Sequence, residues 1–459
     1  MNNFWDFSVW GSFHLLAVLL VSLLAANILK RTVKFLRVSL IPTSVLGGVI
    51  LLVIAEIYGA ITGEVFFDTA FFGGKGVSNL EIITYHTLAL GFIAATLKSS
   101  GGKLSKKRTG EIFDTGVTTV STYLLQGILG MAITIPAAML VDGFFPAGGI
   151  LLPFGYGQGT GQALNFGVIF ETEHGFIGGR SFGLTIAALG FLSASLGGVI
   201  HLNLLKKRGK IYVKTGEEGA VQMEEIQSEN EIPMQGSMDK TTVQVAFVSL
   251  AYLLSYVFMF LLGMLLPGMK SVIYGFNFIL GVLAATLVKT VVNILTKKQI
   301  IRRKYINDFL MTRISNFFYD IMVVAGIAAI RLGILEDYWG IILIMGVVGL
   351  VSTYFYNYYI AKTLFPDYTE EQFLMMYGML TGTASTGIIL LREIDGSFKT
   401  PASDNMVYQN FPAIVFGFPL MLLANLAPVQ PVLTLLILAA FFAVMNLILF
   451  RRQIFRKKK

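Results

Sequence analysis

Long hydrophobic runs recur along the whole of this 459-residue chain. Most are close to the roughly 20 residues that an α-helix needs to cross the hydrocarbon core of a bilayer. Only 14% of the residues are charged, whereas about a quarter are charged in an ordinary soluble domain. The sequence therefore predicts an all-α polytopic membrane protein without a separate soluble domain of useful size.

We expect eleven membrane-spanning helices, placed on these runs by length and apolar character. Their predicted ranges are 9–29, 41–60, 82–98, 115–140, 180–205, 243–266, 273–295, 316–335, 338–361, 408–426 and 431–450. The first run is too long for a signal-peptide core and lacks a small-residue cleavage pattern, so we expect it to be retained. The chain has no cysteine, which excludes disulfides and cysteine-ligated metals.

Basic residues predict the orientation in the membrane. With the N-terminus outside, the basic clusters all fall on one side of the predicted spans, at 30–37, 103–108, 206–210, 297–304 and 451–459. Cytoplasmic loops carry an excess of Lys and Arg, so this side is the cytoplasm. We therefore expect a multi-pass protein of the cell (inner) membrane with its N-terminus outside and its central linker and C-terminus in the cytoplasm. The net charge of +8 then reflects topology, and no nucleic-acid partner is expected.

The two halves of the chain resemble each other. "LGFIAATLK" at 90–98 matches "VAGIAAIRL" at 324–332, and "GYGQGTGQA" at 155–163 matches "YGMLTGTAS" at 377–385. The order is the same in both halves, and five spans per half turn the second copy upside down. This is the inverted-topology repeat of secondary transporters.

The predicted organisation follows from this repeat. The first repeat covers 1–208, a polar and acid-rich cytoplasmic linker covers 209–240, and the second repeat covers 241–427. An extra C-terminal span and a basic cytoplasmic tail occupy 428–459.

One segment in each half is left over, 147–172 in the first and 373–395 in the second. Each is too short for two crossings, and a single crossing would reverse the sidedness of the flanking spans. We therefore expect two re-entrant hairpins, the first entering from outside and the second from the cytoplasm. The glycines at every second position from Gly155 to Gly161 favour extended backbone over a close helix contact, in which small residues recur at every fourth position.

Such hairpins are suited to binding ions and solutes. Non-helical backbone at membrane depth is tolerated only where it is buried in protein or lines a wet cavity. Freed carbonyls and threonine hydroxyls can coordinate a cation, and the N-terminal ends of half-helices suit an anion such as a carboxylate. The segment "TGTASTG" at 381–387 has this composition.

Three motifs resemble the sodium/glutamate symporter family, and the resemblance covers nearly the whole chain. They are "IPTSVLGG" at 41–48, "GQGTGQA" at 157–163 and "GMLTGTASTGIILLREID" at 378–395. The resemblance implies a sodium-coupled importer of glutamate or a similar acidic amino acid, with sodium as the coupling ion. It also implies a homodimer in which a core carrying both hairpins moves against a dimer scaffold. The chain departs from better-known members at Gln158, where they have a histidine, and in the hydroxyl pattern of the second hairpin.

The two hairpins supply most of the candidate site residues. Expected substrate-binding residues are Gln158, Gly159, Thr160, Gly161, Gln162, Asn165, Thr381, Gly382, Thr383 and Arg392. Expected sodium ligands are Thr383, Ser385, Thr386 and Asp320. Arg392 could bind a carboxylate with its planar guanidinium, or it could be a cytoplasmic charge paired with Glu393 or Asp395.

Ionisable residues inside the predicted spans leave alternatives open. Asp320 and His86 lie 234 positions apart, as the repeat pairs them, and each is expected near the start of its helix. They are therefore functional candidates or residues that face headgroups and cap helices. Glu56 and Lys289 form a second symmetric pair, for which snorkelling to the interface is the favoured explanation.

Other classes of protein have less support. No G-x-x-x-x-G-K-[ST] phosphate loop occurs, which argues against a primary pump. No H-E-x-x-H motif occurs and the chain has only four histidines, so an enzyme is not expected. A sodium- or proton-coupled symporter of another organic anion, such as a dicarboxylate, is the alternative, and a channel is a weaker one.

Overall fold

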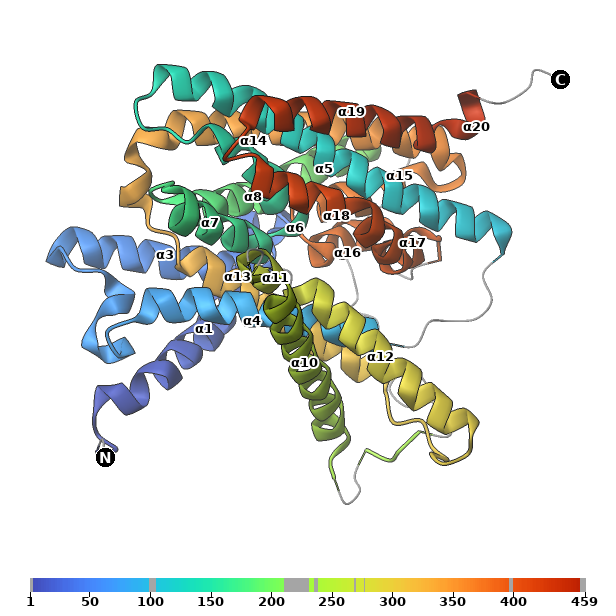
Figure 1. The fold of residues 1–459 in the computed structure, drawn as a ribbon, viewed down its shortest axis with the longest axis horizontal. Helices are drawn as coiled ribbons and strands as arrows, with labels where there is room; N and C mark the ends of the chain where they lie inside the picture. Colours follow the sequence, from blue (N-terminus) through green and yellow to red (C-terminus); the bar gives the residue numbers. More distant parts are fainter. Residues whose placement is uncertain are drawn as a thin grey trace. The chain divides into compact units, whose positions relative to one another are not determined.

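The computed structural model describes residues 3–98, 105–209, 231–234, 238–267, 270–275, 277–395 and 399–454 (Figure 1). The side chains of Ser8, Ser271, Val272, Ser385 and Phe411 lie outside this description. Most of the predicted linker at 209–240 also lies outside the described residues. The described chain is helical, and one isolated β-bridge joins Glu231 to Lys304.

Ten helices in the described residues are long and apolar enough to cross a membrane. They are Val9–Thr32, Thr43–Thr62, Ala70–Leu97, Lys106–Leu140, Gly179–Lys207, Lys240–Leu265, Asn277–Lys297, Asp308–Ala328, Leu332–Leu364 and Pro431–Leu449. A bent pair, Ala402–Tyr408 and Pro412–Leu426, would make an eleventh and covers the predicted span 408–426. The prediction of an all-α multi-pass membrane protein is confirmed.

The helices divide into two compact units. Unit 1 comprises Met1–Glu81, Leu104–Lys214 and Val323–Lys459, and unit 2 comprises Ile82–Lys103 and Thr215–Met322. The helices α4 (Gly76–Leu97) and α13 (Asp308–Ala328) contribute to both units.

Unit 1 contains both predicted hairpin segments, 147–172 and 373–395. Its α-helices are α1 (Phe7–Thr32), α2 (Lys34–Val38), α3 (Thr43–Thr62), α5 (Lys106–Leu140), α6 (Leu151–Gln158), α7 (Thr160–His174), α8 (Gly179–Lys207), α14 (Trp339–Leu364), α15 (Thr369–Thr381), α16 (Ala384–Arg392), α17 (Ala402–Tyr408), α18 (Asn410–Leu426), α19 (Pro431–Leu449) and α20 (Arg451–Ile454). Short 3₁₀ helices join several of them, at Phe66–Asp68, Ala70–Phe72, Pro146–Ile150, Leu332–Tyr338 and Pro366–Tyr368.

The longest helix of unit 1 is α5, and it lies alongside α14 and α19 (Figure 1). Ser105 caps its N-terminus, because the hydroxyl accepts a hydrogen bond from the Arg108 N–H at 3.2 Å. One stretch of the helix is rich in buried hydroxyl groups, at Thr115, Thr118, Thr119, Ser121 and Thr122. Several of these threonines bond the carbonyl four residues earlier, which lets a polar side chain lie inside an apolar bundle.

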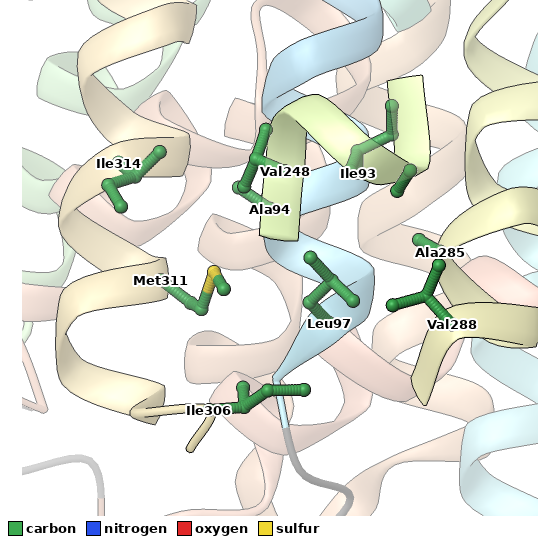
Figure 2. Packing of buried hydrophobic residues seen from close by; sticks show 10 residues of the cluster. Ile93, Ala94, Leu97, Val248, Ala285, Val288, Ile306, Met311 and Ile314 are labelled. Atoms are coloured by element: carbon green, nitrogen blue, oxygen red, sulfur yellow. The ribbon is translucent and has the colours of Figure 1, made fainter. Parts of the chain in front are cut away.

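Unit 2 is built from α10 (Lys240–Leu265), α11 (Lys270–Gly275), α12 (Asn277–Lys297) and the unit 2 portions of α4 and α13. Figure 2 shows an apolar core to which α4, α10, α12 and α13 contribute. It contains Ile93, Ala94, Leu97, Val248, Ala251, Ala285, Val288, Ile306, Met311 and Ile314. The buried Glu231 carboxylate pairs with Lys240 at 2.8 Å and accepts from Asn307 at 2.7 Å, which anchors the end of the linker to unit 2.

Several bounds differ from the sequence-based prediction, and one expectation about the backbone is wrong; α5, for example, begins nine residues before the predicted span at 115–140. The span predicted at 316–335 is α13, which begins eight residues earlier and ends at Ala328 because the chain then turns into the 3₁₀ helix at Leu332–Tyr338. The period-two glycines were expected in extended backbone, and this is wrong. Gly155 and Gly157 lie inside α6, and the helix is interrupted only at Gly159.

Candidate functional site

The first predicted hairpin segment is a pair of helices broken at Gly159, which we call the first broken pair (α6 and α7). Gly159 has φ of +78° and ψ of −168°, a conformation that is essentially restricted to glycine. The chain reverses at this break, because the rings of Phe154 in α6 and Phe166 in α7 stack with centroids 4.1 Å apart. In one continuous helix these two residues would lie about 18 Å apart.

The second predicted hairpin segment is also broken, and we call it the second broken pair (α15 and α16). Gly382 and Thr383 separate the two helices, and Thr383 has extended backbone. Gly378 and Gly387 face each other across the break, because a Cβ added to Gly378 would lie 2.8 Å from the Gly387 Cα. The chain therefore reverses here too, and glycine allows the two arms to touch through their backbones.

The helix α8 brings the two broken pairs together. The Tyr156 hydroxyl in α6 bonds the Ser193 hydroxyl at 2.9 Å, and the Tyr377 hydroxyl in α15 donates to the Ser193 carbonyl at 2.8 Å. Three residues earlier, a Cβ on Gly190 would lie 2.4 Å from the Thr381 carbonyl oxygen and 3.1 Å from the Tyr156 ring. Both breaks therefore lie against the same stretch of α8.

The helix α5 caps the first arm of each broken pair. Tyr123 donates its hydroxyl to the Gly157 carbonyl at 2.9 Å, near the C-terminal end of α6. Gln126 donates its amide to the Leu380 carbonyl at 2.9 Å, near the C-terminal end of α15, and to the Thr353 hydroxyl at 2.9 Å. The last carbonyls of a helix lack partners within the helix, so α5 satisfies one of them in each pair.

The second arms begin at the breaks without such caps. Neither Gly159 before α7 nor Thr383 before α16 makes a side-chain cap. The first N–H groups of a helix have no partner within the helix and carry partial positive charge. Two helix N-termini therefore start beside the meeting point of the two breaks, an arrangement that can hold an anion.

Buried polar atoms near the breaks also lack partners. Within the described residues, no hydrogen-bond partner is found for Gln126 Oε1, Gln162 Nε2 or Thr386 Oγ1. All three side chains are buried, and a buried polar atom without a partner costs roughly 1–3 kcal/mol. These atoms offer two acceptors and one donor to a bound ion, solute or water.

Most of the predicted site residues lie at or beside the two breaks. Gln158 and Gly159 are at the first break, and Thr160, Gly161, Gln162 and Asn165 follow in α7. Thr381, Gly382, Thr383 and Thr386 surround the second break. The Thr381 hydroxyl donates to the Tyr377 carbonyl at 2.6 Å within its own helix. Thr160 packs against α13, where a Cβ on Gly326 would lie 2.6 Å from the Thr160 Cβ.

Of the remaining candidates, only Arg392 is shown to lie away from a break. Arg392 is exposed at the far end of α16, about 12 Å along the helix from Ala384. Asp320 belongs to unit 2 and is half-buried in the middle of α13, not near its start as predicted. The side chain of Ser385 lies outside the described residues.

The other ionisable candidates have hydrogen-bond partners. His86 Nδ1 bonds the Tyr252 hydroxyl at 2.5 Å within unit 2. Glu56 accepts from the Leu332 N–H at 3.2 Å, and the Lys289 ammonium donates to the carbonyls of Thr96 and Lys98. The charged ends of Glu56 and Lys289 thus bond backbone at the ends of neighbouring helices, and snorkelling to the interface stays a prediction for both.

Sequence reasoning missed Tyr123, Gln126 and Ser193. They lie inside continuous helices, where no break or charged neighbour marks them. The one available signal was the density of Thr, Ser and Gln in α5, which is unusual for a membrane-spanning helix.

No protein-family model and no curated protein matches this sequence.

Proposed function

We propose that this protein is a sodium-coupled secondary active transporter that imports glutamate or a similar acidic amino acid. The two broken pairs act as re-entrant hairpins that meet in one binding centre. Neutral oxygens around the breaks hold sodium, and the N-termini of α7 and α16 hold a substrate carboxylate. A core carrying both hairpins alternates its access by moving against a scaffold in a homodimer.

The observation that carries this proposal is the convergence of both breaks on α5 and α8. If each break were only a structural kink, a second broken pair would not be needed. There would also be no reason for the same helix to cap both breaks. Here Tyr123 and Gln126, one turn apart on α5, serve one break each. Broken helices that meet in this way are how secondary transporters build a site for a cation and an anion at the middle of the membrane.

Matching contacts in the two halves support the inverted repeat. A Cβ on Gly48 of α3 would lie 2.7 Å from Ile327 of α13, and a Cβ on Gly281 of α12 would lie 3.0 Å from Ile93 of α4. The residues of these two contacts are related by shifts of 233 or 234 positions. The same shifts relate the contact of Glu56 with Leu332 to that of Lys289 with Lys98.

Contacts among the connections of unit 1 support the predicted sidedness. Lys107 pairs with Asp367 at 2.9 Å, and Arg451 pairs with Asp114 at 2.7 Å, so segments expected at the cytoplasmic side contact each other. Arg180 pairs with Glu81 at 2.7 Å, and both residues are expected outside. Each ion pair therefore joins two segments that the positive-inside rule places on the same side of the membrane.

A symporter of another organic anion remains the alternative, because the hairpin N-termini would bind any small carboxylate. Reconstitution into liposomes separates the two. We expect saturable uptake of labelled glutamate or aspartate that requires an inward sodium gradient. Uptake of dicarboxylates alone, or uptake driven only by a proton gradient, would favour the alternative, and flux that does not saturate would indicate a channel.

A further inference from the structure

A polar cavity of about 260 Å³ lies in unit 1, where three connections meet. It is lined by the start of α4, the turn between α7 and α8, and the segment that follows α13. All three connections are expected on the outer side of the membrane. Glu171 in the cavity wall is about 16 Å along α7 from Thr160, so the cavity lies toward the outer end of the first broken pair.

Acidic groups surround one guanidinium in the cavity wall. Arg180 Nη1 lies 2.7 Å from the Glu81 carboxylate, and Arg180 Nε lies 3.4 Å from the Glu171 carboxylate. A third carboxylate, Asp68, caps the start of α4 by accepting from the Val77 N–H at 3.0 Å. Two carboxylates therefore share one guanidinium while the third caps a helix, which leaves an excess of negative charge in this part of the lining.

Two other cations of the lining have no such partner. In the part of the chain that the structure describes, no carboxylate lies within 4.0 Å of the Lys75 ammonium or the Arg331 guanidinium. Both side chains are exposed. The Arg331 backbone is held in place, because its N–H donates to the buried Ser181 hydroxyl at 3.1 Å. Arg331 therefore presents a free planar fork from a fixed position.

We infer that this cavity is an outer docking site for a zwitterionic amino acid. The Arg331 and Lys75 side chains take the carboxylates, and the carboxylates of Asp68, Glu81 and Glu171 take the ammonium. The volume is below the roughly 300 Å³ at which drug-sized pockets begin, as suits a small metabolite. This inference rests on the proposed import of an acidic amino acid, and it argues against the alternative substrate, a dicarboxylate without an ammonium group.

The balance of charge decides between classes of ligand. A simple dicarboxylate would pair with Arg331 and Lys75, but it would also be repelled by the three carboxylates of the lining. A diamine would pair with the carboxylates, but it would be repelled by the three cations of the lining, Arg331, Lys75 and Arg180. Only a ligand with both kinds of charge pairs with both parts of the lining, because like charges brought together in a partly desolvated cavity repel.

Thiol labelling tests the site without transport. The chain has no cysteine, so Ser78→Cys places a single thiol at an exposed position of the cavity wall. The full-length protein is reconstituted in liposomes without sodium and labelled from outside with a membrane-impermeant maleimide. We expect millimolar L-glutamate to slow labelling, and succinate and 1,4-diaminobutane at the same concentration to have no effect. Protection by either of these two as strong as that by L-glutamate, or no protection by L-glutamate, overturns the inference.

Second-site variants in the Ser78→Cys background identify the groups. Arg331→Gln should weaken protection by L-glutamate about tenfold, because a charge-assisted contact is lost. Lys270→Gln is the matched control, since Lys270 is the other exposed cation expected outside, and it should leave protection unchanged. Thr386→Val alters the second break and should also leave protection by L-glutamate unchanged. If this variant lost protection, the ligand would act at the breaks and the inference would be overturned. Protection in a protein that fails to take up glutamate would reject the proposed function and keep the docking site.

Discussion

Both broken pairs are interrupted inside the protein, but the backbone conformation at the break differs between them. The first is interrupted at one buried glycine in a left-handed conformation, and Tyr123 caps its first arm. The second is interrupted over two residues with negative φ, of which Thr383 is half-buried, and Ala384 beyond it is exposed. Its first arm is capped by Gln126, which keeps a second polar atom without a partner.

This difference indicates a division of roles. The first break has a backbone conformation that is essentially restricted to glycine, so we expect it to tolerate change least. The second has ordinary φ values, more exposure and two buried oxygens without partners, Gln126 Oε1 and Thr386 Oγ1. We therefore expect sodium dependence to follow changes around the second break, and folding to follow changes at the first.

The largest expected effect is that of alanine at Gly159. Forcing a Cβ into its left-handed conformation costs roughly 1–3 kcal/mol, so Gly159→Ala should reduce uptake at least about tenfold and lower thermal stability. Gly382→Ala is the matched variant. Its φ of −134° lies outside the left-handed region, so we expect a smaller loss, although the added Cβ would lie 2.8 Å from the Thr386 hydroxyl and 3.1 Å from the Phe191 ring. Uptake per folded protein and thermal unfolding in detergent measure both, and a larger loss for Gly382→Ala would contradict the division of roles.

The next effect separates the two caps on α5. Gln126→Leu leaves the buried Leu380 carbonyl without its donor, at a cost of roughly 1–3 kcal/mol, and removes Oε1 from the centre. We expect this variant to raise the sodium concentration for half-maximal uptake several-fold. Tyr123→Phe removes only one neutral hydrogen bond and should cost about 1 kcal/mol of stability with unchanged sodium dependence. Equal shifts in sodium dependence would show that both breaks hold the ion.

A smaller effect is expected from single hydroxyl groups of the second broken pair. Thr386 Oγ1 is buried without a partner, whereas Thr381 Oγ1 is bonded to its own helix. Thr386→Val should therefore weaken sodium activation about threefold to tenfold, as for loss of one ion ligand, and Thr381→Val should change it less than about twofold. Uptake across a sodium series, with membrane levels matched, measures the two. The reverse order would move the ion site to the end of α15.

The smallest expected effect is a pH dependence at the exit of the second broken pair. Burial alone would raise the pKa of Asp395, but hydrogen bonds from Thr400 and from the Lys399 N–H outweigh burial and lower it. The ionised form therefore stabilises the fold above the unfolded pKa of about 3.9, and this contribution is lost as the pH falls through the lower folded pKa. Asp395→Asn should reduce thermal stability at pH 7 and have less effect near pH 3. A difference that stays constant with pH would assign the effect to packing.

Much of the fold follows from local features of the sequence. Hydrophobic runs predict eleven spans, and the described residues contain ten helices long and apolar enough to cross a membrane plus one bent pair, because this property needs only composition and length. Gly159 and the Gly382–Thr383 pair occur in segments predicted to be broken, because glycine marks where a helix is easily interrupted. The prediction of extended backbone at Gly155 and Gly157 is wrong. Both residues are helical and pack closely against Ile186 and Tyr123.

The candidate site divides in the same way. Its glycines and threonines could be found from the sequence, since broken helices in a membrane need polar and flexible residues. Tyr123, Gln126 and Ser193 could not, because their importance comes from which carbonyl or hydroxyl lies opposite them. Arg392 looked suitable by its chemistry, but the length of α16 carries it away from the break.

The sequence by itself determined that the chain is an all-helical multi-pass membrane protein and that two of its segments contain interrupted helices, since both follow from apolar length and glycine content. Only the tertiary structure decided that the two breaks meet on α5 and α8 and that three distant connections enclose a charged cavity. Some of these contacts join residues far apart in the chain, as Gln126 and Leu380, which are 254 positions apart. They arise from packing of whole helices, which no local pattern of side chains records.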